Sequence, residues 1–328
     1  MYEARFYETM DESTVRCTLC PHGCRIADGK RGICRTRQCR GGKLYAATYG
    51  ELASANMDPI EKKPLYHFHP GRDILSIGSY GCNFRCPWCQ NFSISQDRVP
   101  TQHFDPGQVV DLARQRGSVG IAYTYNEPLI WAEFVIDTAK LAREAGLVNV
   151  LVTNGFVNPG PLAEMLPFID AANLDIKAIR DEIYRRHCGG PIKPVLETAR
   201  AFVENIHLEV TNLVITGVND SDEDLAALAA WIADNLGRTV PTHLSRYFPQ
   251  YRFDAPPTSA ERLSRGREIF TARLDYVYLG NVTGVGGNDT LCRECGAVLV
   301  RRRGYDVRVE RLRGALCGVC GAENNFVI

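Results

Sequence analysis

The pattern of apolar and polar positions changes near residue 73. From Asp73 onward, short apolar runs alternate with longer amphipathic runs. Apolar runs of four to eight residues are typical of buried strands, whereas apolar residues recurring every three or four positions predict helices. The strand-like runs are 74–78, 119–123, 147–153, 171–176, 207–215, 240–247 and 275–279. The helical runs are 106–116, 128–145, 193–205, 222–236 and 258–273.

Strands that alternate with helices predict parallel βαβ units. Six to seven units in about 210 residues suit a partial or complete TIM-type barrel. An open doubly wound sheet is the alternative, because periodicity does not reveal whether a sheet closes. We expect an α/β barrel over 71–283, with its chemistry at the carboxyl ends of the strands.

Composition separates two further parts from this barrel. Residues 1–70 are rich in Cys, Arg, Gly and His and show little helical or strand periodicity. We expect them to form a small Cys-rich metal-binding module. Gly284–Gly287 is predicted to be a linker, and 289–328 a second small module at the other end of the chain, with a β-hairpin over 297–309.

Charge and cysteine content exclude some classes of protein. Lys plus Arg and Asp plus Glu both number 38, so no cationic field favours nucleic acid or an anionic membrane. The first residues lack the apolar core of a signal peptide, and no run approaches the roughly 20 apolar residues of a membrane span. Thirteen cysteines, an odd number, indicate reduced thiols. We expect a cytoplasmic protein with no membrane partner.

The strongest chemical signal directly follows the first barrel strand, where Cys82, Cys86 and Cys89 have the spacing C-x3-C-x2-C. Three thiolates can ligate three irons of a 4Fe-4S cube, and no fourth cysteine is nearby in the sequence, so one iron stays open. The amino and carboxylate groups of S-adenosylmethionine can chelate an open iron. An electron from the cluster then releases a 5′-deoxyadenosyl radical. A structural zinc knuckle is the alternative.

This motif, with the aromatic Trp88 before its last cysteine, resembles that of the radical SAM superfamily. Glu127 follows the second strand, at a position that resembles the Gly-Gly-Glu motif of these proteins. The resemblance implies that Glu127 accepts a hydrogen bond from the cofactor's amino group and that Asn126 lies beside it. A glutamate that stabilises a helix N-terminus is the alternative for Glu127.

Polar residues also end the later strands. Thr153 and Asn154 end the third strand, and Asp175 and Lys177 end the fourth. Similar residues surround the cofactor and a monovalent cation in pyruvate formate-lyase activating enzymes. This chain has Val152 where those enzymes have an aspartate, so the cation is not expected. Turn and surface ion-pair roles are the alternative. Cofactor or substrate contacts are also expected from the two strands that follow, through Thr211 and His243.

The C-terminal module carries the pattern of a zinc ribbon. Two Cys-x2-Cys pairs are separated by 21 residues: Cys292, Cys295, Cys317 and Cys320. Four thiolates close a tetrahedral site and leave no reactive position, so structural zinc is expected. An iron cluster is the alternative.

Four of the five N-terminal cysteines are also expected to hold a metal: Cys17, Cys20, Cys24 and Cys34. Zinc and an auxiliary 4Fe-4S cluster both suit four thiolates, and the sequence does not separate them. His22 is an alternative ligand, and Cys39 is spare. Cys188 stands apart from all three clusters; a buried free thiol is the expectation, and a hydrogen donor or ligand in the cavity is the alternative.

The resemblance extends over nearly the whole chain. Together, CTLCPHGC, GCNFRCPWCQN, YTYNEP, VTNGF, LDIKA and the terminal ribbon resemble the radical SAM enzyme of the AmmeMemoRadiSam system, which is related to pyruvate formate-lyase activating enzymes. This implies reductive cleavage of S-adenosylmethionine, a low-potential electron donor of flavodoxin or ferredoxin type, and partners with Ammecr and Memo domains. The substrate is not identified. A glycyl-radical activase acting on a protein and a non-enzymatic zinc-ribbon module binding RNA or protein are the alternatives.

Overall fold

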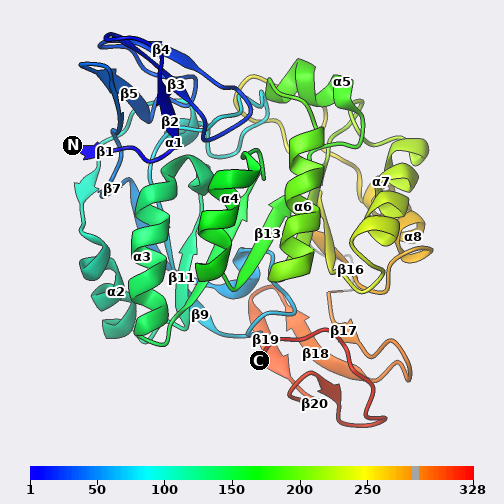
Figure 1. The fold of residues 1–328 in the computed structure, drawn as a ribbon. Helices are drawn as coiled ribbons and strands as arrows, with labels where there is room; N and C mark the ends of the chain where they lie inside the picture. Colours follow the sequence, from blue (N-terminus) through cyan, green and yellow to red (C-terminus); the bar gives the residue numbers. More distant parts are fainter. Residues whose placement is uncertain (283–287) are drawn as a thin grey trace.

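The computed structural model describes residues 1–282 and 288–328, so the predicted linker lies outside the described residues. The chain forms a large α/β unit, with the N-terminal strands at one end of it and the C-terminal strands at the other (Figure 1). In the described part of the chain, no helix combines the length and the apolarity that crossing a membrane requires.

An eight-stranded sheet forms the centre of the large unit, in the order β16-β15-β14-β13-β12-β11-β9-β8. All neighbours from β9 to β16 are parallel, and β8 runs antiparallel to β9. Among the described residues no pairing joins the edge strands β8 and β16, so the sheet is a partial barrel. The strands are β8 (Ser54–Pro59), β9 (Asp73–Gly78), β11 (Gly120–Tyr123), β12 (Val148–Thr153), β13 (Ala171–Asp175), β14 (His207–Val214), β15 (Thr242–Arg246) and β16 (Val277–Gly280).

Helices cover the convex face of this sheet (Figure 1). Their starts follow capping rules: Asp105 and Gln108 form a capping box at α2, and the side chains of Ser221 and Ser259 accept backbone N–H groups at α7 and α8. The longer helices are α2 (Pro106–Gln115), α3 (Ala132–Glu144), α4 (Pro159–Met165), α6 (Lys193–Asn205), α7 (Asp222–Asn235) and α8 (Ala260–Thr271). The short ones are α1 (Phe92–Ser95), α5 (Asp181–Ile183), the 3-10 helices η1 (Ile60–Lys62), η2 (Pro128–Trp131) and η3 (Leu166–Phe168), and the π-helix η4 (Tyr184–Cys188).

Successive strand residues face opposite sides of the sheet. Both faces of this sheet carry buried apolar residues, as is typical of parallel sheets. On β9, Leu75 belongs to the large hydrophobic core beneath the helices. Its neighbour Ile74 packs with Val150 against Leu65 and Phe68, which come from the segment that precedes β9. That segment therefore fills the amino-terminal part of the barrel's concave face.

The small modules consist of short strands. The N-terminal strands form the sheets β1-β6-β5 and β2-β3-β4, while β7 pairs with β10. The C-terminal strands form β17-β18-β19 and β20-β21. These strands are β1 (Tyr2–Glu3), β2 (Tyr7–Thr9), β3 (Thr14–Cys17), β4 (Arg25–Ala27), β5 (Arg37–Arg40), β6 (Lys43–Ala46), β7 (Glu51–Leu52), β10 (Gln102–His103), β17 (Thr290–Leu291), β18 (Val298–Arg303), β19 (Asp306–Val309), β20 (Leu312–Arg313) and β21 (Leu316–Cys317).

The expected barrel strands and the hairpin at 297–309 are present, with ends that differ by a few residues. The N-terminal region departs from the prediction, because it contains strands where little strand pattern was visible. Those strands have two to six residues, too few for a periodic pattern to be recognised. Strand β8 lies before residue 70 but pairs along its whole length with β9, so the large sheet begins inside the region 1–70. The helix expected over 128–145 begins as η2, and α4 had not been predicted.

Candidate functional site

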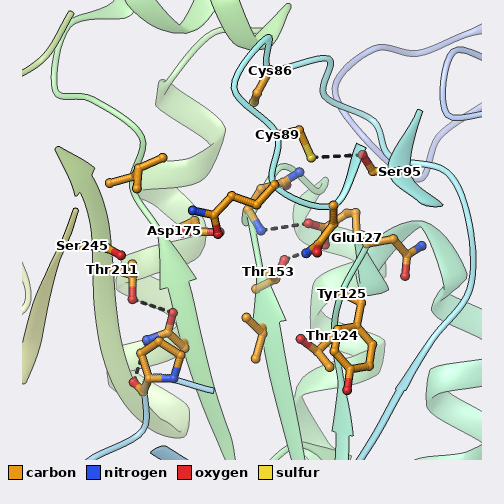
Figure 2. Close-up of a pocket in the computed structure, with 18 of the residues that line it drawn as sticks. Cys86, Cys89, Ser95, Thr124, Tyr125, Glu127, Thr153, Asp175, Thr211 and Ser245 are labelled. Atoms are coloured by element: carbon orange, nitrogen blue, oxygen red, sulfur yellow. Dashed lines mark hydrogen bonds between the residues drawn. The ribbon is translucent and has the colours of Figure 1, made fainter. Parts of the chain in front are cut away.

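A cavity of about 440 Å³ opens at the carboxyl ends of the strands. This volume lies within the range of about 300–1,000 Å³ that is common for small-molecule sites. Figure 2 shows Cys86 and Cys89 on one side of the cavity, facing Glu127, Thr153 and Asp175 on the strand ends. The cavity thus combines thiols with charged and hydrogen-bonding groups.

The cysteine loop follows β9 directly. Cys82, Cys86 and Cys89 all line the cavity. The Phe84 backbone N–H donates to Cys82 Sγ at 3.3 Å, and Cys89 Sγ lies 3.1 Å from Ser95 Oγ. Burial raises the pKa of the Cys82 and Cys89 thiols, whereas the hydrogen bond with Cys188 lowers the pKa of Cys86.

Cys188 is a fourth cysteine near this loop. Its Sγ lies 3.5 Å from Cys86 Sγ, and its side chain is fully buried. It comes from the π-helix η4 and is not among the residues that line the cavity. Among the described cysteines, only the three of the loop motif therefore line the cavity, although the sulfur of a fourth lies in contact with that of Cys86.

Asn126 holds the backbone that leads into the cysteine loop. Its Oδ1 accepts from the Ser79 N–H at 3.1 Å, and its Nδ2 donates to the Gly81 carbonyl at 3.1 Å. Asn126 also lines the cavity. The amide expected to contact a cofactor is therefore engaged by the loop itself, so its direct effect is to position Cys82.

Glu127 is buried and lines the same cavity. Its Oε1 accepts from Thr153 Oγ1 at 2.6 Å and from the Leu129 N–H at 3.0 Å, and its Oε2 accepts from the Asn154 N–H at 2.8 Å. Burial raises the pKa of Glu127 to about 7, against the opposing effect of these donors. A carboxylate oxygen can accept two hydrogen bonds, so Oε2 has room for one more donor.

Asn154 connects the third strand to the cysteine loop. Its Nδ2 donates to Asn83 Oδ1 at 2.9 Å and lies 3.7 Å from Cys82 Sγ. Asn83 in turn donates to the Phe156 carbonyl at 2.7 Å. These bonds tie Cys82 to the end of β12.

Two residues of opposite charge line the cavity at the end of β13, Asp175 in the strand and Lys177 just after it. Lys177 Nζ is 2.7 Å from Asp175 Oδ2. Burial opposes the charged ammonium, but Asp175 and Cys86 raise the pKa of Lys177 above its ordinary value. Lys177 is thus a cation held close to the cysteine loop. On β14, Thr211 Oγ1 donates to Asn173 Oδ1 at 2.9 Å.

Trp88 lines the cavity between the last two cysteines of the motif. Its ring packs against His187 and Phe253, with centroids 5.1 and 5.4 Å away. The indole Nε1 is buried and has no hydrogen-bond partner among the described residues. A buried donor without a partner is unfavourable.

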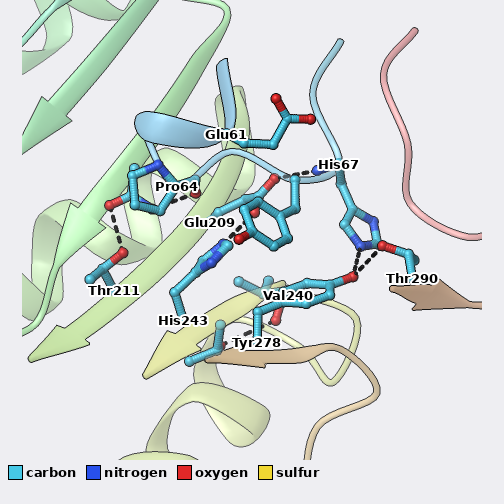
Figure 3. Close-up of polar contacts among 12 residues, drawn as sticks. Glu61, Pro64, His67, Glu209, Thr211, Val240, His243, Tyr278 and Thr290 are labelled. Atoms are coloured by element: carbon cyan, nitrogen blue, oxygen red, sulfur yellow. Dashed lines mark hydrogen bonds and ion pairs between the residues drawn. The ribbon is translucent and has the colours of Figure 1, made fainter. Parts of the chain in front are cut away.

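His243 is the one expected cofactor contact that the structure does not bring into the cavity. Its Nε2 lies 2.7 Å from Glu209 Oε2, and its ring packs near that of Tyr278 (Figure 3). The Tyr66 ring lies on it edge to face, with the centroids 4.7 Å apart. Ser245, two residues further along β15, lines the cavity instead. Two residues advance a strand by about 6.6 Å, so His243 lies one layer deeper in the barrel.

The segment before β9 contributes a charged group to which the sequence assigned no role. Asp58 accepts from Lys62 Nζ and Lys63 Nζ at 2.7 Å each, and from the Tyr125 hydroxyl at 2.6 Å. Burial raises the pKa of Asp58, but these donors together lower it well below its usual range. Both lysines and Tyr125 line the cavity, as does Tyr305 from the C-terminal hairpin. The charged residues of the run Asp58–Lys63 were visible in the sequence. Their place beside the cavity could not be predicted from the sequence, because it depends on how this segment packs on the barrel.

The C-terminal cysteines form a compact group. All four sulfurs of Cys292, Cys295, Cys317 and Cys320 lie within 4.8 Å of one another. Two of the separations are 3.6 Å, between Cys292 and Cys320, and 3.8 Å, between Cys295 and Cys317. Tetrahedral zinc with bonds of about 2.3 Å requires sulfurs about 3.8 Å apart, so the four residues fit a metal ion.

The N-terminal cysteines line a second, small cavity, together with His22. His22 Nε2 lies 2.8 Å from the Asn83 carbonyl oxygen, so His22 connects the N-terminal module to the cysteine loop that follows β9. Cys39 does not line that cavity, and its Sγ lies 3.6 Å from the Ser13 carbonyl oxygen. The four residues that line it are Cys17, Cys20, Cys24 and Cys34.

Comparison with known proteins agrees with this geometry. The family model described as "Radical SAM superfamily" matches residues 76–231. An uncharacterized protein of Methanocaldococcus jannaschii is 42% identical over 336 residues, which cover all of both chains. The pyruvate formate-lyase 1-activating enzyme of Escherichia coli is 27% identical over 166 residues, covering 47% of this chain and 66% of that enzyme.

Among solved structures, a radical SAM methyltransferase from Sphaerobacter thermophilus superimposes with a TM-score of 0.50 and 18% identity. The match covers 84% of this chain and 76% of the methyltransferase. At this identity the similarity concerns the fold alone, and it agrees with a partial barrel.

Proposed function

Because the chain belongs to the radical SAM superfamily, we propose that it cleaves S-adenosylmethionine reductively and abstracts a hydrogen atom from a substrate not yet identified. The observation that carries this proposal is the composition of one cavity. Cys82, Cys86 and Cys89 line it, and so do Glu127 and Lys177 from neighbouring strand ends.

The residues present suit the cluster and the cofactor. Cys82, Cys86 and Cys89 line the cavity while the fourth nearby cysteine, Cys188, does not, so these three would hold a 4Fe-4S cube with one iron left open. When bound, the cluster and S-adenosylmethionine supply the electron transfer and the carbon radical, chemistry that side chains alone do not provide.

The chain's own residues then bind, orient and exclude water. Asn126 and Asn154 hold the backbone and the sulfur of Cys82. Glu127 Oε2 has capacity for one donor, which suits the amino group of an amino acid. Lys177 is a partly buried cation, which suits a carboxylate. Holding these groups in place before the reaction lowers the entropic cost of orienting the ligand.

Anaerobic reconstitution tests the proposal. We expect an iron–sulfur absorption spectrum that changes when S-adenosylmethionine is added, and release of 5′-deoxyadenosine under a strong reductant. The Cys86→Ala variant is the matched control and should release none, because its cluster site has lost a ligand. An intact cluster that yields no deoxyadenosine in the unaltered protein would refute the proposed reaction.

A glycyl-radical activase is the second candidate, favoured by the similarity to activating enzymes of pyruvate formate-lyase, 4-hydroxyphenylacetate decarboxylase and isethionate sulfite-lyase. In that case the substrate is a glycine loop of a large protein. Mixing the reduced enzyme with candidate proteins and recording a glycyl radical by electron paramagnetic resonance tests it. A small-molecule product that accumulates without any partner protein argues against it.

The remaining assignments rest on the sequence and on the geometry of the small modules. We propose a low-potential electron donor of flavodoxin or ferredoxin type, structural zinc on the four ribbon cysteines, and proteins with Ammecr and Memo domains as partners. The zinc proposal is supported by the short separations between the ribbon sulfurs. Co-purification with each candidate partner, and zinc content before and after chelation, test these assignments separately.

A further inference from the structure

The cavity contains a second group of charges, which reaches it from the amino-terminal side of the sheet. The last residue of β8 pairs with Asp73 at the start of β9, whereas the cysteine loop follows the end of β9. Lys62 and Lys63 come directly after β8, so they approach the cavity from the end opposite the cysteines. Figure 2 shows Tyr125, whose ring Lys63 contacts, at the opposite end of the cavity from Cys86.

One carboxylate holds both lysines. Lys62 Nζ and Lys63 Nζ each lie 2.7 Å from a different oxygen of Asp58, and the Tyr125 hydroxyl donates to the same carboxylate at 2.6 Å. The side chains of Asp58 and Lys63 are buried, whereas that of Lys62 is 47% exposed. Burial lowers the pKa of Lys63, but Asp58 opposes this effect and favours the charged form. The buried lysine therefore balances the charge of Asp58, and Lys62 carries a positive charge with no second carboxylate to match it.

The acidic residues of this segment do not offer a negative charge to the cavity. Asp58 is not among the residues that line it. Glu61 does not line it either, because its Oε1 accepts from the Gly71 N–H at 2.8 Å and lies 3.9 Å from Arg302 Nε. Among the described residues, Asp58 is the one carboxylate within ion-pair distance of Lys62. This end of the cavity is therefore positively charged.

The C-terminal ribbon adds a hydroxyl to the same end. Tyr305 lies in the turn between β18 and β19, is 60% exposed and lines the cavity. Asp58 is the main cause of the raised pKa of Lys62, and Tyr305 contributes to it, which places the hydroxyl near the ammonium. The hairpin that carries Tyr305 is held by Arg302, whose buried guanidinium lies 4.3 Å from the centre of the Tyr66 ring.

A lysine held in this way suits an oxyanion. An ammonium has three N–H donors, and Asp58 takes one of those of Lys62. Charge-assisted hydrogen bonds from lysine to a carboxylate or a phosphate are about twice as strong as bonds between neutral groups. The Tyr305 hydroxyl can donate a further bond to the same group. A substrate amine would meet no carboxylate at this end of the cavity, so a negative group is favoured.

We propose that Lys62 and Tyr305 bind a carboxylate or phosphate group of the substrate, so that the substrate is an anionic molecule. Its anionic group lies at the lysine end of the cavity, and the rest of it extends toward the cysteine loop. The ribbon thereby completes the substrate site through Tyr305. The substrate role rests on the proposed function, whereas the binding of an anion at Lys62 does not.

The affinity for two simple anions tests the site without any turnover. Isothermal titration calorimetry at constant ionic strength, on protein purified anaerobically and given no reductant, measures the binding of inorganic phosphate and of acetate. We expect the parent to bind at least one of them, and the tighter one identifies the group that the substrate carries. The binding should persist when S-adenosylmethionine is saturating. Displacement by S-adenosylmethionine would place the anion at Lys177 and contradict the proposal, as would a parent that binds neither anion.

Variants of Lys62 locate the anion. Lys62→Gln should weaken its binding about tenfold, and Lys62→Glu should abolish it, because a like charge repels the anion. Lys62→Arg keeps the charge and should retain the binding. Tyr305→Phe should weaken it about fivefold through the loss of one hydrogen bond. Lys193→Glu makes the same change at a lysine whose side chain is 83% exposed on α6, and it should bind as the parent does.

A structural ion pair predicts a different result. In that case Lys62→Glu lowers the free energy of unfolding but leaves the anion affinity unchanged, and this outcome would refute the proposal. Equal loss of affinity in Lys62→Glu and Lys193→Glu would also refute it. Deoxyadenosine release is measured separately. An affinity that depends on Lys62 in a protein that releases no deoxyadenosine supports the anion site and refutes only the proposed reaction, whereas normal release with an affinity independent of Lys62 refutes only the anion site.

Discussion

Arg37 Nη1 lies 2.6 Å from Glu133 Oε1, and both side chains are 1% exposed. Arg37 belongs to β5 of the N-terminal module, and Glu133 to the first turn of α3 on the barrel. Burial raises the pKa of Glu133, but the guanidinium lowers it below its ordinary value. The pair therefore joins the cysteine-rich module to the barrel through two charges removed from water.

Arg37→Met should destabilise the protein by about 3–5 kcal/mol, because it leaves the Glu133 carboxylate buried without its cation. Chemical denaturation, monitored by circular dichroism, measures this loss. The double variant Arg37→Met with Glu133→Leu should recover part of it, since no buried charge remains. A single variant within about 0.5 kcal/mol of the parent would contradict the burial of this pair.

The buried contacts of His67 predict that acid weakens the attachment of the C-terminal ribbon to the barrel. Its Nε2 lies 2.6 Å from the Tyr278 hydroxyl, its Nδ1 3.1 Å from the Asn324 carbonyl oxygen, and its ring stacks on Phe326 (Figure 3 shows its contact with Tyr278). Burial lowers the pKa of His67 to about 3. The unfolded chain binds a proton at about pH 6.5, so stability falls as the pH drops below that value.

We expect a loss of up to about 1.4 kcal/mol per pH unit from this group between about pH 6.5 and pH 4.5. The pKa of Glu209 is also lowered, against the effect of burial, by His207 and His243, so its contribution is lost in the same direction at lower pH. His67→Phe, which preserves the stacking, should show a shallower dependence on pH in denaturant titrations. His103→Asn alters an exposed histidine and should not. Equal slopes in the parent and His67→Phe would disprove this origin.

Cys188 should be a neighbour of the cluster and not a ligand. Its sulfur lies behind Cys86, outside the cavity. Cys188→Ala should therefore retain iron and deoxyadenosine release, at a cost of about 1 kcal/mol in stability for the small void. Cys86→Ala should lose the 4Fe-4S cluster. Iron analysis and product assays on both variants check this, and iron loss in Cys188→Ala would make it a ligand.

Cys317→Ala should abolish binding of the zinc proposed for the ribbon and loosen residues 288–328. Structural zinc contributes folding free energy directly, so its loss should unfold the module. The barrel has its own core and should stay folded. Zinc analysis combined with limited proteolysis measures both effects. A variant that keeps its zinc would show that Cys317 is not a ligand. A barrel that unfolds with the ribbon would show that the two do not fold independently.

Gly81 should be intolerant of any side chain. Its φ is +88°, and an added Cβ would meet the Cys34 carbonyl oxygen at 2.5 Å. Gly81→Ala should destabilise the protein and reduce iron content, because the strain falls between the two cysteine loops. Gly160→Ala, at an open position in helix α4, should stabilise it by about 0.5–1 kcal/mol. A Gly81→Ala variant with the parent's melting temperature and iron content would rule out this close contact.

The sequence by itself determined the barrel strands from β9 onward, most of the longer helices and the three groups of cysteines. The strands β9 and β11–β16 followed from apolar runs, because a strand buried on both faces must be apolar along its length. The three cysteine groups were visible because cysteines that could share one metal centre are close together in the sequence. Since parallel strands end at one edge, every expected strand-end contact except His243 lines the cavity.

Only the tertiary structure decided what depends on distance between remote segments. It placed β8 on the edge of the large sheet, Asp58 beside Tyr125, and His243 one layer below the cavity. It also brought the four ribbon sulfurs within 4.8 Å of one another and placed four N-terminal cysteines around one small cavity. Periodicity records which face a residue takes, whereas its depth along the barrel and its partners depend on how the faces pack.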